Sequence, residues 1–263
     1  MHRYLDTHPQ VCMSDPKETD FFQHHYDRGI AYLEECFDHC PDVRAYGETS
    51  PGNMIHPKAA ERIATHFPTA RIIFVLRNPI ERAYSQYLYG IMLGTDSPTD
   101  SFSDLIRDPN DDWGQRILEL GLYYKQIRRF ERHFSHDQMW VGLFRDFKQK
   151  NEEFVRSILE FIDIEKKPQV NVDEKHNTTR YPRSKRILRA VYTLWEPVKS
   201  ILPESVLGQM HGLRSGVRDA LFQSGAQEKP SMKPADRKYL RDYYAEPNRR
   251  LENWLGRGLS HWT

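Results

Sequence analysis

The chain has 263 residues, 38% of them hydrophobic and 12% aromatic, so it is long enough to bury a full hydrophobic core. Its 38 basic and 37 acidic residues give a net charge of +1, which offers no reason to expect nucleic acid or an anionic membrane as a partner. No run of 18 apolar residues and no basic, apolar leader occurs. We therefore expect no integral membrane segment and no secretion, and place the protein in the cytoplasm.

Three cysteines, Cys12, Cys36 and Cys40, lie near the N-terminus. They form no CxxC pair and no Cys/His spacing of the kind that holds a metal. Cys36 and Cys40 lie four residues apart on a predicted helix, and we expect reduced, partly buried thiols.

Helical and strand-like segments alternate along the chain. Periodicity predicts helices ending near residue 7 and over 21–37, 57–68, 117–134, 151–164 and 233–255, and strands at 43–47, 72–76 and 138–144. Residues 166–185 form a polar stretch without periodicity, and further helices are expected from residue 186. The alternation predicts a three-layer α/β fold with a central parallel sheet, in one domain over residues 1–263.

The segment "RIIFVLRNPIERAYSQY", residues 71–87, carries the clearest functional signal. Its continuous apolar run is typical of a strand covered on both faces in a parallel sheet, and it ends at Arg77. Pro79 starts a helix, and Ser85 falls about two turns into that helix. Ligands collect at the carboxyl ends of such strands, where a helix start favours an anion. The alternative is an arginine paired with a nearby carboxylate and a serine on an ordinary helix face.

This segment resembles the 3′-phosphate-binding segment of sulfotransferases that use 3′-phosphoadenosine 5′-phosphosulfate (PAPS). Four further blocks resemble bacterial members and the heparan sulfate sulfotransferases in order and spacing: "HPQVCMSDPKETDFF", "YGETSPGNM", "GLYYKQIRRFERHF" and "LENWLGRGLSHW". The resemblance covers nearly the whole chain and implies a P-loop NTPase-like α/β fold. It also implies that Arg77 and Ser85 bind the 3′-phosphate of PAPS, and that a sulfuryl group passes to a hydroxyl or amine of a small-molecule, lipid or carbohydrate acceptor.

The block "DPKETDFF" resembles the segment that holds the catalytic base in the heparan type. The resemblance assigns that role to Glu18 and places Lys17 beside it, near the donor or the substrate; a solvated Lys–Glu pair on a loop is the alternative. His24 and His25 are alternative bases, because related cytosolic sulfotransferases use histidine. Asp20 stands where some relatives have histidine. Positioning and electrostatics can support the transfer, so no metal is implied.

Two further blocks contribute candidate residues. "NTTRYPRSK" resembles the basic loop that closes over the nucleotide, which places Thr178, Thr179 and Arg180 at the phosphates; a flexible basic loop without a ligand is the alternative. Glu48 and Ser50 follow a strand and either face the acceptor or form an ordinary strand-end turn.

The beginning of the chain departs from the family pattern. Family members open with a strand and a Gly-x-x-Lys-x-Gly-Thr-Thr loop that binds the 5′-phosphosulfate, and this sequence contains no such loop and no GxxxxGK[ST] motif. We therefore expect a chain that is N-terminally truncated relative to the family and that transfers sulfate poorly. The alternative is a degenerate, non-catalytic nucleotide-binding or interaction protein; a nucleotide kinase would need the loop even more. The sequence makes no prediction about oligomeric state.

Overall fold

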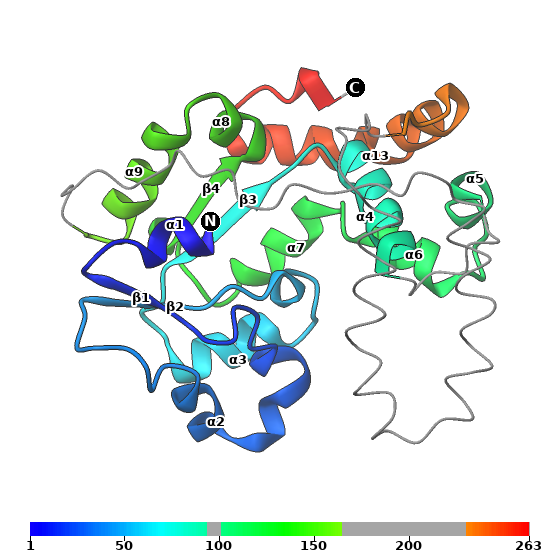
Figure 1. Cartoon of the computed structure of the whole chain (residues 1–263). Coiled ribbons are helices and arrows are strands. Elements are labelled where there is room, and N and C mark those ends of the chain that lie inside the picture. The colour runs from blue at the N-terminus through cyan, green and yellow to red at the C-terminus, as the bar shows by residue number, and fades with distance from the viewer. Residues whose placement is uncertain (94–100, 165–229, 263) are drawn as a thin grey trace, which may run out of the picture. The chain divides into compact units, whose positions relative to one another are not determined.

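The computed structural model describes residues 1–93, 101–164 and 230–262, and Figure 1 shows their elements along the chain. The chain divides into two compact units that alternate in the sequence. Unit 1 consists of Met1–Pro79, Leu122–Lys175 and Tyr244–Thr263, and unit 2 of Ile80–Gly121 and His176–Tyr243. The prediction of one domain over residues 1–263 stays a prediction.

Four parallel strands lie in unit 1. They are β1 (Val11–Met13), β2 (Ala45–Gly47), β3 (Ile72–Leu76) and β4 (Met139–Leu143). β1 pairs with β2 and β3 with β4, so the described residues form two two-stranded parallel sheets instead of the single central sheet that we expected. Each described strand has one described strand neighbour. The sequence did not predict β1, because three residues are too short to show a period.

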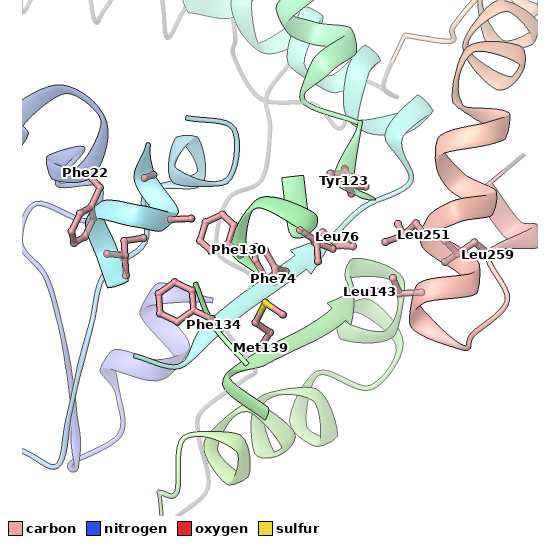
Figure 2. Close-up of a cluster of buried hydrophobic side chains, with 14 of the residues drawn as sticks. Phe22, Phe74, Leu76, Tyr123, Phe130, Phe134, Met139, Leu143, Leu251 and Leu259 are labelled. Carbon is pink, nitrogen blue, oxygen red and sulfur yellow. The ribbon is translucent and has the colours of Figure 1, made fainter. Parts of the chain in front are cut away.

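One face of the β3–β4 sheet packs against α7 (Tyr123–Phe130). Phe74 of β3 meets Phe130 of α7 edge to face, with ring centroids 5.1 Å apart. Figure 2 shows Leu76, Met139 and Leu143 in the same cluster of buried side chains. The C-terminal residues of α13 (Pro234–Leu255) complete the cluster, which makes this face the main core of unit 1.

The opposite face of the same sheet packs against α9 (Asn151–Phe161) and α1 (His2–Asp6). Ile73 and Trp140 point to this side, and Trp140 meets Phe154 of α9 with ring centroids 5.1 Å apart. Successive strand residues therefore alternate between two helical layers, as the predicted three-layer arrangement requires. Val75 is 37% exposed, so the prediction that this strand is fully covered on both faces was wrong at that residue.

Two predicted long helices are broken. Residues 21–37 form a π-helix (Phe21–His25), a 3₁₀ turn (Tyr26–Arg28) and α2 (Ile30–Glu35), because Gly29 adopts a φ of +79° that ends the turn before α2 begins. Residues 117–134 divide between α6 (Asp112–Glu119) and α7. Amphipathic periodicity continued across both breaks, so the sequence pattern alone did not reveal them.

The remaining elements agree with the predicted helices or are short additions. They are η3 (Pro51–Met54), α3 (Ala59–His66), α4 (Pro79–Leu93), α5 (Phe102–Leu105), η4 (His136–Gln138), α8 (Phe144–Gln149) and η5 (Ser260–Trp262). In unit 2, Arg107 donates to the buried carboxylate of Asp236 at 2.7 Å, and the Ser103 hydroxyl donates to the same carboxylate at 2.8 Å. This buried acid is therefore neutralised and hydrogen-bonded within its own unit.

The cysteines differ from the expectation. Cys12 and Cys40 form a disulfide, whereas Cys36 is a buried free thiol. The expectation of a reduced thiol at Cys40 was therefore wrong. The sequence spacing could not show the bond, because the partners are 28 residues apart and are brought together by the pairing of β1 with β2.

Within the described ranges, none of the helices is both long and apolar enough to cross a lipid bilayer. The polar stretch 166–185, with the predicted phosphate-loop residues Thr178, Thr179 and Arg180, lies outside the described residues, as do the helices expected directly after residue 186.

Candidate active site

Arg77 directly follows the last residue of β3, as predicted. Its backbone is fixed because the Tyr123 hydroxyl donates to the Arg77 carbonyl oxygen at 2.9 Å. The side chain is half-buried, and its guanidinium carbon lies 5.7 Å from the ring centroid of Phe144. No carboxylate among the described residues pairs with this guanidinium. A half-buried cation at a strand end that has no anionic partner in the described part of the chain is suited to an anionic ligand.

Ser85 lies on α4, which begins at Pro79, two residues after Arg77. It belongs to unit 2, and its side chain is half-buried. Its hydroxyl can donate to a phosphate oxygen or accept from a neighbouring group.

Lys17 and Glu18 lie on the loop that joins β1 to the π-helix. The Lys17 ammonium is 3.2 Å from Glu18 Oε1, and the two side chains are 53% and 47% exposed. The predicted base thus faces solvent in an ion pair with its neighbour, as the alternative of a solvated pair also requires. Exposed pairs of this kind contribute about 0–1 kcal/mol, so little free energy is needed to separate them.

The loop backbone is held more firmly than these two side chains. The hydroxyls of Ser14 and Thr49 both donate to the Lys17 carbonyl oxygen, at 3.4 Å and 3.2 Å. The Tyr32 hydroxyl donates to the carbonyl oxygen of Thr19 at 3.4 Å. These three contacts fix the backbone on both sides of Glu18 and leave its carboxylate accessible.

Glu48 joins this loop to the loop that follows β2. Its Oε1 accepts from the Thr19 hydroxyl at 3.0 Å and from the Ser50 hydroxyl, and its Oε2 accepts from the Asn53 amide at 3.1 Å. Ser50 in turn accepts from the backbone N–H of Asp20 at 3.0 Å. Because β1 and β2 are parallel, their carboxyl ends lie at one edge of the sheet, and Glu48 ties the two loops there. Glu48 and Ser50 therefore form hydrogen bonds within the turn that follows β2 and to the loop that follows β1.

The π-helix carries the two alternative bases. It begins after Asp20, whose φ of +50° lies in the left-handed region. His24 is exposed, and the ring of His25 meets Tyr32 edge to face at 5.3 Å between centroids. π-Helical turns occur often at functional sites, so His24 and His25 stay candidate bases beside Glu18.

Sequence reasoning missed the residues that support the loop. Thr19, Thr49 and Asn53 were not singled out, yet their side chains hold the backbone around Glu18 or the carboxylate of Glu48. Threonine and asparagine after strands are common in any loop, so only the strand pairing identifies their partners.

The parallel strands and the helices packed on both faces of the β3–β4 sheet define an α/β protein in which Arg77 lies at the carboxyl end of a parallel strand. A model described as the sulfotransferase family matches residues 1–168. The chain therefore belongs to the sulfotransferase family, as the sequence motifs indicated.

Individual relatives agree with this family. The chain is 28% identical to the heparan sulfate glucosamine 3-O-sulfotransferase 3B1 of Homo sapiens over 140 residues, 52% of this chain and 35% of that protein. It is 24% identical to the bifunctional heparan sulfate N-deacetylase/N-sulfotransferase 1 of Xenopus tropicalis over 283 residues, all of this chain but 29% of that protein. The chain thus spans about a third of the length of these relatives.

A solved structure shares the fold. The crystal structure of a sulfotransferase from Alicyclobacillus acidocaldarius matches with a TM-score of 0.68 and 22% sequence identity, covering 99% of this chain and 91% of that one. This likeness supports the α/β fold.

Proposed function

We propose that this chain is a PAPS-dependent sulfotransferase in which Arg77 and Ser85 bind the 3′-phosphate of the nucleotide. The observation that carries the proposal is the half-buried guanidinium of Arg77, which has no carboxylate partner among the described residues. A guanidinium fork makes paired, charge-assisted hydrogen bonds with a phosphate, and a serine hydroxyl adds a further donor. Thr178, Thr179 and Arg180 are proposed to bind the other phosphates of the donor.

In the proposed reaction, a hydroxyl or amine of the acceptor attacks the sulfur of PAPS. A bond forms between the acceptor atom and sulfur, and the bond from sulfur to the bridging oxygen of the 5′-phosphate breaks. Adenosine 3′,5′-bisphosphate is the leaving group. Glu18 accepts the proton that the acceptor loses, and the ammonium of Lys17 stabilises negative charge on the donor. The weakness of the exposed Lys17–Glu18 pair allows both side chains to turn toward the substrates.

For the acceptor, we propose an anionic carbohydrate. Two of the relatives are named for heparan sulfate, and a group of cationic side chains supports the same class here. Burial lowers the pKa of His56, and the nearby charges of Arg62, His24, Lys58 and Arg129 lower it further. Such a concentration of cationic groups attracts a polyanion and repels a cationic acceptor.

The donor assignment is tested by calorimetry with two nucleotides. Adenosine 3′,5′-bisphosphate should bind more tightly than 5′-AMP, because only the former carries the 3′-phosphate. Arg77→Ala should remove most of that preference, about 10- to 150-fold in affinity, which corresponds to one charge-assisted hydrogen bond of about 1.5–3 kcal/mol. Arg71→Ala is the matched control, because Arg71 precedes the same strand and pairs with Asp163 at 2.7 Å. Equal affinity of the wild type for both nucleotides would contradict the assignment.

Catalysis is tested with labelled PAPS and a panel of acceptors. Sulfated and unsulfated glycosaminoglycans, a neutral sugar, a phenol and an amine cover the proposed classes. The proposal expects transfer to anionic carbohydrate before the others, at the low rate expected for these 263 residues, which contain no phosphosulfate loop. Nucleotide binding without transfer to any acceptor would favour the non-catalytic alternative.

A further inference from the structure

The side chains of Cys12, His39 and Cys40 form a cluster that takes no part in the proposed reaction. Cys12 lies on β1 and is 6% exposed, whereas His39 and Cys40 lie in the connection between α2 and β2. The two sulfurs are joined as a disulfide. The His39 Nε2 atom lies 3.7 Å from the Cys12 sulfur and 3.7 Å from the Cys40 sulfur.

These distances are close to those of a tetrahedral zinc site. With Zn–S of about 2.3 Å and Zn–N of about 2.0–2.1 Å, two tetrahedral ligands are separated by about 3.6 Å for sulfur and nitrogen and about 3.8 Å for two sulfurs. The imidazole nitrogen already lies at that distance from both sulfurs. Only the separation of the two sulfurs has to increase, and the Cα atoms, 5.9 Å apart, allow this through side-chain rotation.

We propose that Cys12, Cys40 and His39 form a Zn²⁺ site when the disulfide is reduced. In an oxidising solution Cys12 and Cys40 form the disulfide. In a reducing solution, such as the cytoplasm that the sequence predicts, the two thiolates and His39 bind the metal ion. The proposal concerns residues other than those assigned to sulfuryl transfer and does not depend on that function.

The redox step balances with an external thiol as reductant. Two thiols are oxidised to one disulfide, and the bond between the Cys12 and Cys40 sulfurs is replaced by two S–H bonds. Zn²⁺ then displaces the two thiol protons and binds two thiolates and the neutral imidazole of His39. Three protein ligands leave the fourth tetrahedral position to water.

Both states make the same mechanical connection. Each ties β1 to the turn between α2 and β2, next to the backbone hydrogen bond from the Asp15 N–H to the Cys36 carbonyl oxygen at 2.8 Å. Asp15 begins the loop that carries Lys17 and Glu18. The metal ion would thus hold the start of this loop in a compartment where a disulfide does not persist.

Cobalt provides a spectroscopic test. Full-length protein is reduced with a phosphine, the reductant is removed without oxygen, and Co²⁺ is titrated while thiolate-to-cobalt charge-transfer and tetrahedral d–d absorption are recorded. We expect one Co²⁺ per chain with thiolate absorption, displaced by one equivalent of Zn²⁺. Oxidised protein should show no such absorption.

Substitutions assign the ligands. Cys12→Ser and Cys40→Ser should each remove the charge-transfer band, and His39→Asn should weaken Co²⁺ binding by at least about 10-fold. Cys36→Ser is the matched control, because Cys36 is a buried cysteine outside the cluster whose thiol donates to the Tyr32 carbonyl oxygen at 3.3 Å. It should bind Co²⁺ as the wild type does.

A second measurement needs no variant. Zn²⁺ should protect Cys12 and Cys40 of the reduced wild type from alkylation by iodoacetamide, as mapped by peptide mass spectrometry. Cys36 provides the internal reference, since burial raises the pKa of its thiol and slows its reaction with or without the metal. Reduced wild type that binds no Co²⁺ and gains no protection from Zn²⁺ would overturn the proposal and leave a structural disulfide.

Discussion

Replacing Glu48 should loosen the loop that carries the proposed base. Its half-buried carboxylate accepts hydrogen bonds from the side chains of Thr19, Ser50 and Asn53. Thr19 and Ser50 are only 1% and 6% exposed, so water cannot easily replace the lost acceptor. Glu48→Ala therefore leaves three donors without a partner inside the turn.

The expected magnitude follows from these contacts. A hydrogen bond to a charged group contributes about 1.5–3 kcal/mol, and three of them that share one half-buried carboxylate add up to less than their sum. We expect Glu48→Ala to lower the free energy of unfolding by about 2–4 kcal/mol. Glu48→Gln should lower it by only about 1 kcal/mol. Its amide oxygen still accepts from Thr19, and its NH₂ can donate to the Asn53 Oδ1 atom, which is buried without a partner and becomes available when that amide turns over.

Urea unfolding followed by tryptophan fluorescence measures these differences. Glu34→Ala is the control, since Glu34 is an exposed carboxylate on α2 and its loss should change the free energy by less than about 0.5 kcal/mol. Hydrogen exchange should also show faster exchange at the N–H of Asp20, which donates to Ser50. If Glu48→Ala were as stable as the control, the carboxylate would not tie the two loops and the reasoning would be wrong.

Three further predictions address the base, the core and the pH dependence. In a chain extended with the family's phosphosulfate loop, Glu18→Gln should keep nucleotide affinity and lower turnover by about 10²- to 10⁴-fold, measured with labelled PAPS; an unchanged rate together with a loss in His24→Ala or His25→Ala would move the base to that histidine. Gly142→Ala should lower the free energy of unfolding by about 1–3 kcal/mol in a urea titration, because a Cβ atom there would collide with the rings of Trp140 and Phe154; unchanged stability would mean that both rings can move aside. The folded-state pKa of His56 is lowered, chiefly by burial, so the unfolded chain binds the proton first and stability should fall as pH falls through about 6.5. His56→Gln should make this fall shallower in thermal melts between pH 7.5 and 5.5, and identical curves would exclude a contribution from His56.

The local signals in the sequence were dependable where the pattern was strong. The five-residue apolar run gave β3, and the arginine that ends it lies where the sequence placed it. Pro79 starts α4 as predicted, because proline is tolerated at the first helical turn. These features depend on neighbouring residues, so the order of residues along the chain is sufficient to predict them.

Features that depend on distant partners were missed or mistaken. Glu48 was left between two interpretations, and only the pairing of β1 with β2 shows that it binds Thr19 from the other loop. The helix predicted over 21–37 divides at Gly29, where a positive φ interrupts a continuous apolar period. Local periodicity contains no information about either outcome.

The sequence by itself determined the family, the strand that ends at Arg77, and the residue types that suit a phosphate and a proton acceptor. The tertiary structure decided which of those side chains have partners: Glu18 is paired with Lys17, whereas Arg77 has no described carboxylate partner. It also brought Cys12 together with His39 and Cys40, although their spacing resembled no metal or disulfide motif. The reason is physical: a motif fixes the chemistry of a side chain, but burial, pairing and ligation depend on atoms that only the folded chain brings within a few ångströms.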